Sequence, residues 1–264
     1  MNRIQTIIDK EWAEVFKNRL VIFTVVLLPL IFTILPLVVL SLTRSSGGGS
    51  SNSSSSDMPA SFAAACGDLP MSDCIQIFTV NEFLLFYMII PVIIPITIAA
   101  YSIVGEKTTR SLEPLLATPI TTTELLAGKS IAAAVPAILA TWASFLVFIL
   151  LAPLVGASPA VVAHIISPTW LLAVIVAGPL MAILSVNFAL FVSSRVNDPR
   201  VAEQISAVLV LPILIVLFGQ IAGFIVLNVS TMLLFIAALA VIDVAMIYVG
   251  ARLFQRETIL TRWK

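Results

Sequence analysis

The sequence has few charged residues. Only 11% of its 264 residues are Asp, Glu, Lys or Arg, and 60% are hydrophobic, whereas an ordinary soluble domain carries about 25% charged residues. The formal net charge is zero, so there is no basic surplus of the kind that binds nucleic acid. This balance excludes a typical soluble protein and predicts an integral membrane protein with no nucleic-acid partner.

Side chains for catalysis or metal binding are also scarce. The chain has one histidine, His164, and two cysteines. A membrane enzyme would need clustered Ser and His, paired Asp or several converging metal ligands. We therefore expect no catalytic residues, no metal site and no cofactor bound by this chain, with His164 a lone surface histidine in an external segment.

Long apolar runs dominate the sequence instead. Each is close to the ~20 residues that cross a hydrocarbon core as a helix, and none alternates like a barrel strand. We predict one all-α transmembrane domain over residues 1–264. The six predicted spans are residues 20–42, 83–104, 131–151, 170–192, 205–227 and 231–250.

The basic residues predict the orientation of this domain. Thirteen of the 14 Lys and Arg fall in alternate segments between the spans, and only Arg44 falls in the other set. By the positive-inside rule the first set is cytoplasmic. We therefore expect a multi-pass protein of the cell membrane with both termini, including the tail 251–264, in the cytoplasm.

The longest predicted external loop, residues 43–82, begins with a Ser- and Gly-rich tract that has nothing to bury, so we expect a flexible segment there. Cys66 and Cys74 follow, separated by seven residues. Because an oxidising external compartment permits disulfides, we predict a Cys66–Cys74 bond. The alternative is two unpaired thiols.

Residues 1–19 have the pattern of an amphipathic helix. Ile4, Ile8 and Trp12 share one face with other apolar residues, which predicts a helix lying in the interface plane of the membrane. Glu11 is an exception, because it falls inside the apolar arc.

The longest predicted cytoplasmic loop, residues 105–130, ends in Gly-Lys-Ser, the triplet that closes a phosphate-binding loop. That loop also needs a glycine six residues before the lysine, with five residues between the two. Here the lysine is Lys129 and the position holds Thr123, so we expect no nucleotide to bind there.

The same loop has the pattern of a docking surface. Leu112, Leu115 and Leu116 have helical spacing before Pro119, and a threonine at 121–123 is placed to cap a second short helix containing Glu124. Apolar residues on a loop too short to form its own core suggest contact with a partner.

Asp243 is the one ionisable residue within a predicted span, at a cost of roughly 2.5–3.5 kcal/mol for insertion. It must be protonated, or hydrogen-bonded to groups such as Asn187, Gln220, Thr141 or Ser144, or in contact with a cation or water. Asn187, Gln220 and Asp243 are the candidate pathway residues.

Gly219 and Gly223 lie four residues apart in the fifth predicted span. This spacing allows close approach of another helix or a break in the helix. We favour the break, because only residues 228–230 otherwise separate two full spans.

The loop sequence GEKTTRSLEPLLATPITTTELLAGK, residues 105–129, resembles the loop between the second and third spans of permease subunits in the type-2 ATP-binding-cassette (ABC) transporter family. The stretch SSRVNDPRVAEQ, residues 193–204, is similar to the loop between that family's fourth and fifth spans. The family usually has a glycine near Ser111.

The resemblance implies an exporter half-transporter in which two permease copies, identical or close paralogues, form the pathway. Separate cytoplasmic ATPase subunits would bind ATP and Mg²⁺. Residues 106–116 would then be the coupling element seated in the ATPase, next to the N-terminal helix. Its charged residues would set the register and its leucines would supply buried contact; the residues in these roles are Glu106, Lys107, Arg110, Leu112, Glu113, Leu115 and Leu116.

A stand-alone secondary transporter or channel is the main alternative to a permease. Such proteins show paired half-repeats with broken helices, or rings of charge, and the sequence shows no convincing repeat. The apolar pathway fits amphipathic or lipid-like cargo, a drug or an ion, and the sequence does not choose among these.

Overall fold

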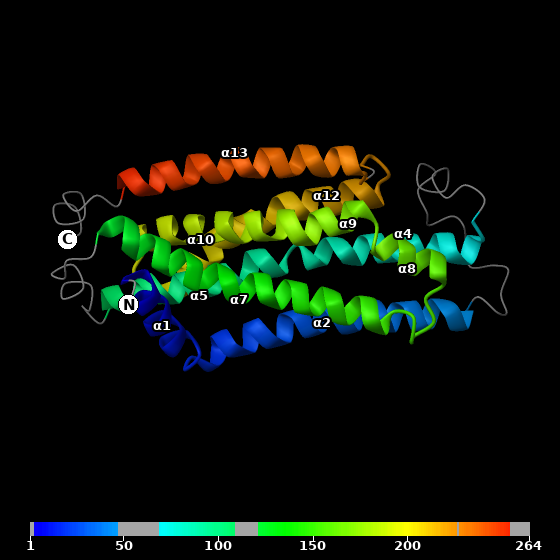
Figure 1. Cartoon of the computed structure of the whole chain (residues 1–264), viewed down its shortest axis with the longest axis horizontal. Helices are drawn as coiled ribbons and strands as arrows, with labels where there is room; N and C mark the ends of the chain where they lie inside the picture. The colour runs from blue at the N-terminus through cyan, green and yellow to red at the C-terminus, as the bar shows by residue number, and fades with distance from the viewer. Residues whose placement is uncertain (1–2, 47–68, 109–120, 226, 254–264) are drawn as a thin grey trace.

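The computed structural model describes residues 3–46, 69–108, 121–225 and 227–253 and shows an elongated bundle of helices (Figure 1). All regular elements among these residues are helices. The first helix, α1 (Arg3–Val15), and the last residues of α13 (Val229–Leu253) lie at the same end of the bundle. We call this the termini end, and the opposite one the far end.

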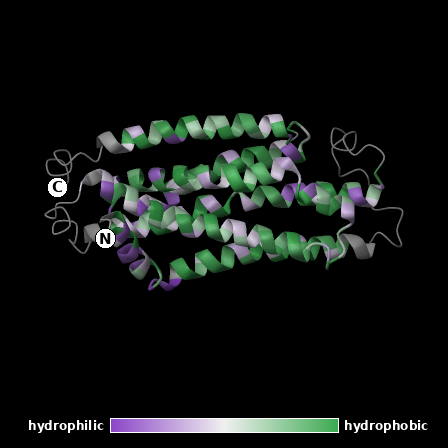
Figure 2. Cartoon of the chain, in the orientation of Figure 1, coloured by the Kyte–Doolittle hydropathy of each residue, from purple (hydrophilic) through white to green (hydrophobic). Residues whose placement is uncertain are grey.

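Six helical segments of the described chain are long and apolar enough to cross a membrane, which confirms the predicted all-α fold with six spans. Figure 2 shows hydrophobic residues along the length of the bundle and hydrophilic residues gathered on α1 and near helix ends. The six segments are Val21–Leu42, Met71–Ser102, Thr123–Leu151, Pro159–Arg195, Pro199–Ile221 and Val229–Gly250.

The helical segment that contains the second predicted span begins at Met71, in α4 (Met71–Tyr87), 12 residues before the predicted boundary at residue 83. The predicted boundary lies inside the helix because Asn81 and Glu82 interrupt the apolar run. The bundle accommodates Asn81, whose Oδ1 accepts a hydrogen bond from Trp170 Nε1 and pairs with His164 Nε2, both at 2.9 Å. Glu82 lies inside this candidate span, so Asp243 is not the one acid within the six apolar helical segments.

A proline produces the junction between α4 and α5 (Ile90–Thr108). Pro91 has no N–H to donate and follows directly after Ile90. The chain passes from one helix to the next through Met88 and Ile89, whose N–H groups bond to Leu85 O and Phe86 O at 3.0 Å. The combined span is the most buried of the six, and α5 packs against α7, α10 and α11.

The helix of the third span, α7 (Thr122–Leu151), begins nine residues before the predicted boundary at residue 131. Thr121 and Glu124 form a capping box: Thr121 Oγ1 accepts from Glu124 N, and Glu124 Oε2 accepts from Thr121 N. The predicted threonine cap is present. The predicted short second helix is instead the first part of α7, because no proline interrupts the chain before Pro136.

The fourth span contains a π-helical segment, Ala173–Ala177, between α9 (Pro168–Leu172) and α10 (Gly178–Arg195). Gly178 N bonds to Ala173 O, five residues earlier, which leaves Val174 O without its usual partner. Trp142 Nε1 of α7 donates to Val174 O at 3.1 Å. A short helix, α8 (Pro159–Ile165), precedes α9 at the far end.

The predicted break in the fifth span is present. This span runs through α11 (Pro199–Ser206) and a 3₁₀ segment (Ala207–Val210) into α12 (Leu211–Ile221). Gly223 follows with φ of 77°, a conformation that favours glycine. Gly219 O accepts from both Phe224 N and Ile225 N, and a Cβ on Gly219 would lie 2.6 Å from Ile225 Cδ1. The close approach is thus made by the turn and not by a neighbouring helix.

Candidate functional site

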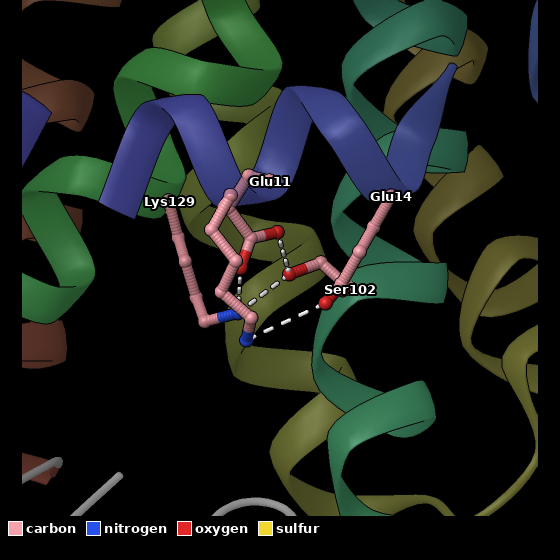
Figure 3. Close-up of polar contacts among 5 residues, drawn as sticks. Glu11, Glu14, Ser102 and Lys129 are labelled. Carbon is pink, nitrogen blue, oxygen red and sulfur yellow. Dashed lines mark hydrogen bonds and ion pairs between the residues drawn. The ribbon is translucent and has the colours of Figure 1, made fainter. Parts of the chain in front are cut away.

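The N-terminal helix α1 is attached to the bundle by a buried ion pair at the termini end (Figure 3). Lys129 Nζ of α7 donates to Glu11 Oε1 of α1 at 2.6 Å and to Ser102 Oγ of α5 at 2.7 Å. Ser102 Oγ donates to Glu11 Oε2 at 2.6 Å. We call these three residues the α1 clamp, because they join three helices that are distant in the sequence.

Burial makes each member of the α1 clamp depend on the others. Only 3% of the Glu11 side chain and 3% of the Lys129 side chain are exposed. Removing a charge from water costs several kcal/mol, which is offset only when the partner is close and the remaining lone pairs are bonded. Glu11 meets this condition, since both of its oxygens accept a hydrogen bond.

Close packing of α1 against α7 supports the α1 clamp. Trp12 Nε1 donates to Ala132 O at 3.0 Å. Gly128 has no side chain where Ile7 approaches, and a Cβ there would lie 2.8 Å from Ile7 Cγ2 and 3.0 Å from Ile7 Cβ. Ile7 is β-branched and has little freedom to move away. Gly128 is therefore needed for the docking of α1.

Substituting Gly128 with alanine is expected to lower the melting temperature of the purified chain, because the new methyl group displaces Ile7. Overpacking of this kind costs about 1–3 kcal/mol. Gly105→Ala is the matched control, because it is also a helix glycine but has nothing within 4 Å of its Cβ position. That control should be neutral or stabilising. Equal melting temperatures for the two variants would contradict a tight Ile7–Gly128 contact.

The α1 clamp lies beside both stems of the predicted coupling loop. Ser102 precedes Thr108, the last residue of α5, and Lys129 follows Thr122, the first residue of α7. The backbone at Glu106 and Lys107 belongs to α5. The other predicted coupling residues lie outside the described part of the chain: Arg110, Leu112, Glu113, Leu115 and Leu116.

A second contact holds α5 from another side. Thr97 Oγ1 donates to Glu203 Oε1 of α11 at 2.6 Å. Asp198 caps α11 by accepting a hydrogen bond from Arg200 N at 2.8 Å, so the segment 193–204 forms a defined turn between α10 and α11. The helix that leads into the coupling loop is thus bonded to both α1 and α11.

The three candidate pathway residues lie on different helices, α10, α12 and α13. Asn187 Nδ2 donates to Ile183 O of its own helix at 2.9 Å. Gln220 and Asp243 are each 4% exposed, and no described residue bonds to Gln220 Oε1 or to either Asp243 oxygen. The expected hydrogen bonds to Asp243 are therefore not observed within the described chain.

The far end differs from expectation at His164. This residue is half-buried and paired with Asn81, and is not a lone surface histidine. The described residues contain no group of three or more His, Cys, Asp or Glu placed to hold a metal ion. Cys74 is buried and disulfide-bonded, whereas its predicted partner Cys66 lies outside the described residues.

Sequence reasoning missed the α1 clamp. The one signal for it was Glu11, an acid inside the apolar arc of an amphipathic helix. Its partner belongs to the Gly-Lys-Ser triplet that resembled the end of a phosphate loop. Lys129 instead lies about two turns inside a continuous helix and is bonded to a carboxylate of this chain.

The sequence of this chain matches a known protein family. The family described as "ABC-2 family transporter protein" matches residues 5–256, which is nearly the whole chain. No curated protein and no solved structure matches. With six spans and a family match of this extent, the chain is a transmembrane protein that belongs to the ABC-2 family of transporter proteins.

Proposed function

We propose that this chain is the permease subunit of an ABC exporter, in which two permease copies form the cargo pathway. A separate cytoplasmic ATPase binds ATP and Mg²⁺ and drives transport, while this chain itself binds no cofactor. Membership of the ABC-2 family supports a permease role and a partnership with an ATPase. The second copy, identical or a close paralogue, belongs to the proposal.

The observation that carries the proposal is the α1 clamp beside the loop stems. A loop that transmits force needs stems that do not slide relative to the bundle. Lys129 bonds to the carboxylate of α1 and to Ser102 of α5, so a push on residues 109–120 reaches three helices at once. The Thr97–Glu203 bond extends this connection to α11.

Orientation follows from the distribution of charge. Thirteen of the 14 Lys and Arg belong to the segments that alternate on one side of the spans, and the positive-inside rule places that side in the cytoplasm. In the proposed arrangement the termini end faces the cytoplasm of a cell membrane. The loop from residue 106 to 116 would then project toward the ATPase.

The proposed division of work in the loop follows from residue chemistry. Leu112, Leu115 and Leu116 supply apolar contact area in a cleft of the ATPase, and four charged residues set the register. Those four are Glu106, Lys107, Arg110 and Glu113. Cargo with a large apolar part fits best, because the spans contain few ionisable side chains.

The experiment is reconstitution in liposomes with an ABC ATPase expressed together with the chain. We expect the ATPase to co-purify with the chain. We also expect cargo movement to stop when the ATPase is replaced by a variant unable to hydrolyse ATP. Cargo movement by the purified chain alone would overturn the proposal. Cysteine-accessibility labelling that places residues 109–120 outside the cell would overturn it as well.

A further inference from the structure

The structure contains an acid that the sequence pattern placed outside the membrane. Glu82 lies on α4, 11 residues after Met71, and thus about 16 Å along the helix from its far-end start. It is half-buried as a residue, but both of its carboxylate oxygens are covered. A covered carboxylate within a candidate span requires a partner, because isolated charge is costly inside a membrane.

The helix α12 packs against α4 and brings a polar side chain close to Glu82. Gln220 lies beside the Glu82 carboxyl, and is itself only 4% exposed. Neither oxygen of Glu82, nor Gln220 Oε1, has a hydrogen-bond partner among the described residues. Neither α4 nor α12 contains Lys, Arg or His.

The two side chains together have more acceptors than donors. The three oxygens share only two N–H groups, both of which belong to the Gln220 amide nitrogen. Even an amide turned to donate to Glu82 leaves one carboxylate oxygen and its own Oε1 unpaired. The arrangement therefore suits a ligand that brings positive charge and several donors.

A protonated amine meets this requirement better than a divalent metal ion. An ammonium group carries up to three N–H donors in a small volume. Ca²⁺ and Mg²⁺ take six or more oxygen ligands, of which this pair supplies three, and the described residues hold no cluster of metal-binding side chains.

Aromatic residues lie close to Glu82 along α4. Phe86 is one helical turn from Glu82 on the same face of α4. Its ring stacks on Phe32 of α2 with centroids 5.7 Å apart and lies 6.1 Å from the Phe83 ring. Aromatic rings attract cations through their faces and also offer contact to an apolar tail.

We propose that Glu82 and Gln220 form a binding site for the protonated amine of an amphipathic cargo molecule, whose apolar part lies against Phe83 and Phe86. As a cargo site it rests on the proposed permease function. The binding itself is testable on the chain without the ATPase. Failure of one proposal therefore does not imply failure of the other.

The test measures binding of three matched probes to the purified full chain in a neutral detergent. Dodecylamine carries a positive charge and N–H donors. Dodecyltrimethylammonium carries the charge without N–H donors, and dodecanol carries neither the charge nor N–H donors. We expect dodecylamine to bind about tenfold tighter or more than either of the others, as for a hydrogen bond to a charged group. Equal affinity for all three would overturn the proposal without any substitution.

The variants locate the site. Glu82→Gln keeps the shape of the side chain and should reduce dodecylamine affinity to that of dodecanol, and Gln220→Leu should reduce it less. Asp73→Asn is the control, because it removes the same charge nine residues earlier on α4. Unchanged dodecylamine affinity in Glu82→Gln would show that the amine does not bind to the Glu82 carboxylate and would overturn the proposal. An equal loss of affinity in Asp73→Asn would overturn it as well.

Discussion

Replacing Lys129 with alanine is expected to destabilise the chain more than any other single substitution at the termini end. The change leaves the Glu11 carboxylate buried without its cation, and removing one partner of a buried ion pair costs about 3–5 kcal/mol. Ser102 remains, but it donates to the other carboxylate oxygen and carries no charge. We expect a large fall in melting temperature, measured by thermal unfolding in detergent, and proteolytic release of α1.

The control for this prediction is Lys10→Ala on the same helix. Lys10 pairs with Glu14 at 3.7 Å, and the two side chains are 37% and 56% exposed. Exposed pairs of this kind contribute only about 0–1 kcal/mol, so the melting temperature should hardly change. The double variant Glu11→Leu with Lys129→Met removes both charges and should recover most of the loss. A Lys129→Ala protein with the same melting temperature as the wild type would contradict a stabilising buried ion pair.

Hydropathy predicted the number and type of the spans because lipid requires long, continuous apolar helices. The helices α4 and α7 extend beyond the predicted ends of the spans, where polar residues are bonded inside the bundle. The polar Asn81 suggests the end of a span, yet its Oδ1 accepts a hydrogen bond from Trp170 Nε1 inside the bundle. The charge of Lys129 suggests a loop, yet Lys129 lies within α7 and forms an ion pair with Glu11 of α1. One-dimensional patterns do not contain these partners.

The prediction of the candidate site was limited in a different way. Glu11 and Lys129 are separated by 118 residues, and nothing in a single sequence identifies such a pair. Glu11 was visible only as an acid on the wrong face of an amphipathic helix. Glu82 was hidden by a span boundary drawn at residue 83, so the buried carboxylate beside Gln220 required the course of α4.

Introducing a charge at Leu115 is expected to abolish coupled transport while the protein still inserts. If Leu115 fills a cleft of the ATPase, an aspartate there must be desolvated without a partner. A central apolar anchor of an interface typically accounts for 2 kcal/mol or more, which corresponds to about a 30-fold weaker contact. We expect co-reconstituted Leu115→Asp to hydrolyse ATP without moving cargo, or to lose the ATPase on purification.

Two further variants separate contact from stability. Glu113→Lys reverses a charge proposed to set the register, so it should also uncouple hydrolysis from transport, whereas Leu115→Met keeps the apolar volume and should transport normally. Both Leu115→Asp and Glu113→Lys should have the melting temperature of the wild type, because neither residue belongs to the α1 clamp. Lys129→Ala should lose transport and stability together. Normal transport by Leu115→Asp and Glu113→Lys would show that force does not enter through this loop, even if the α1 clamp behaves as expected.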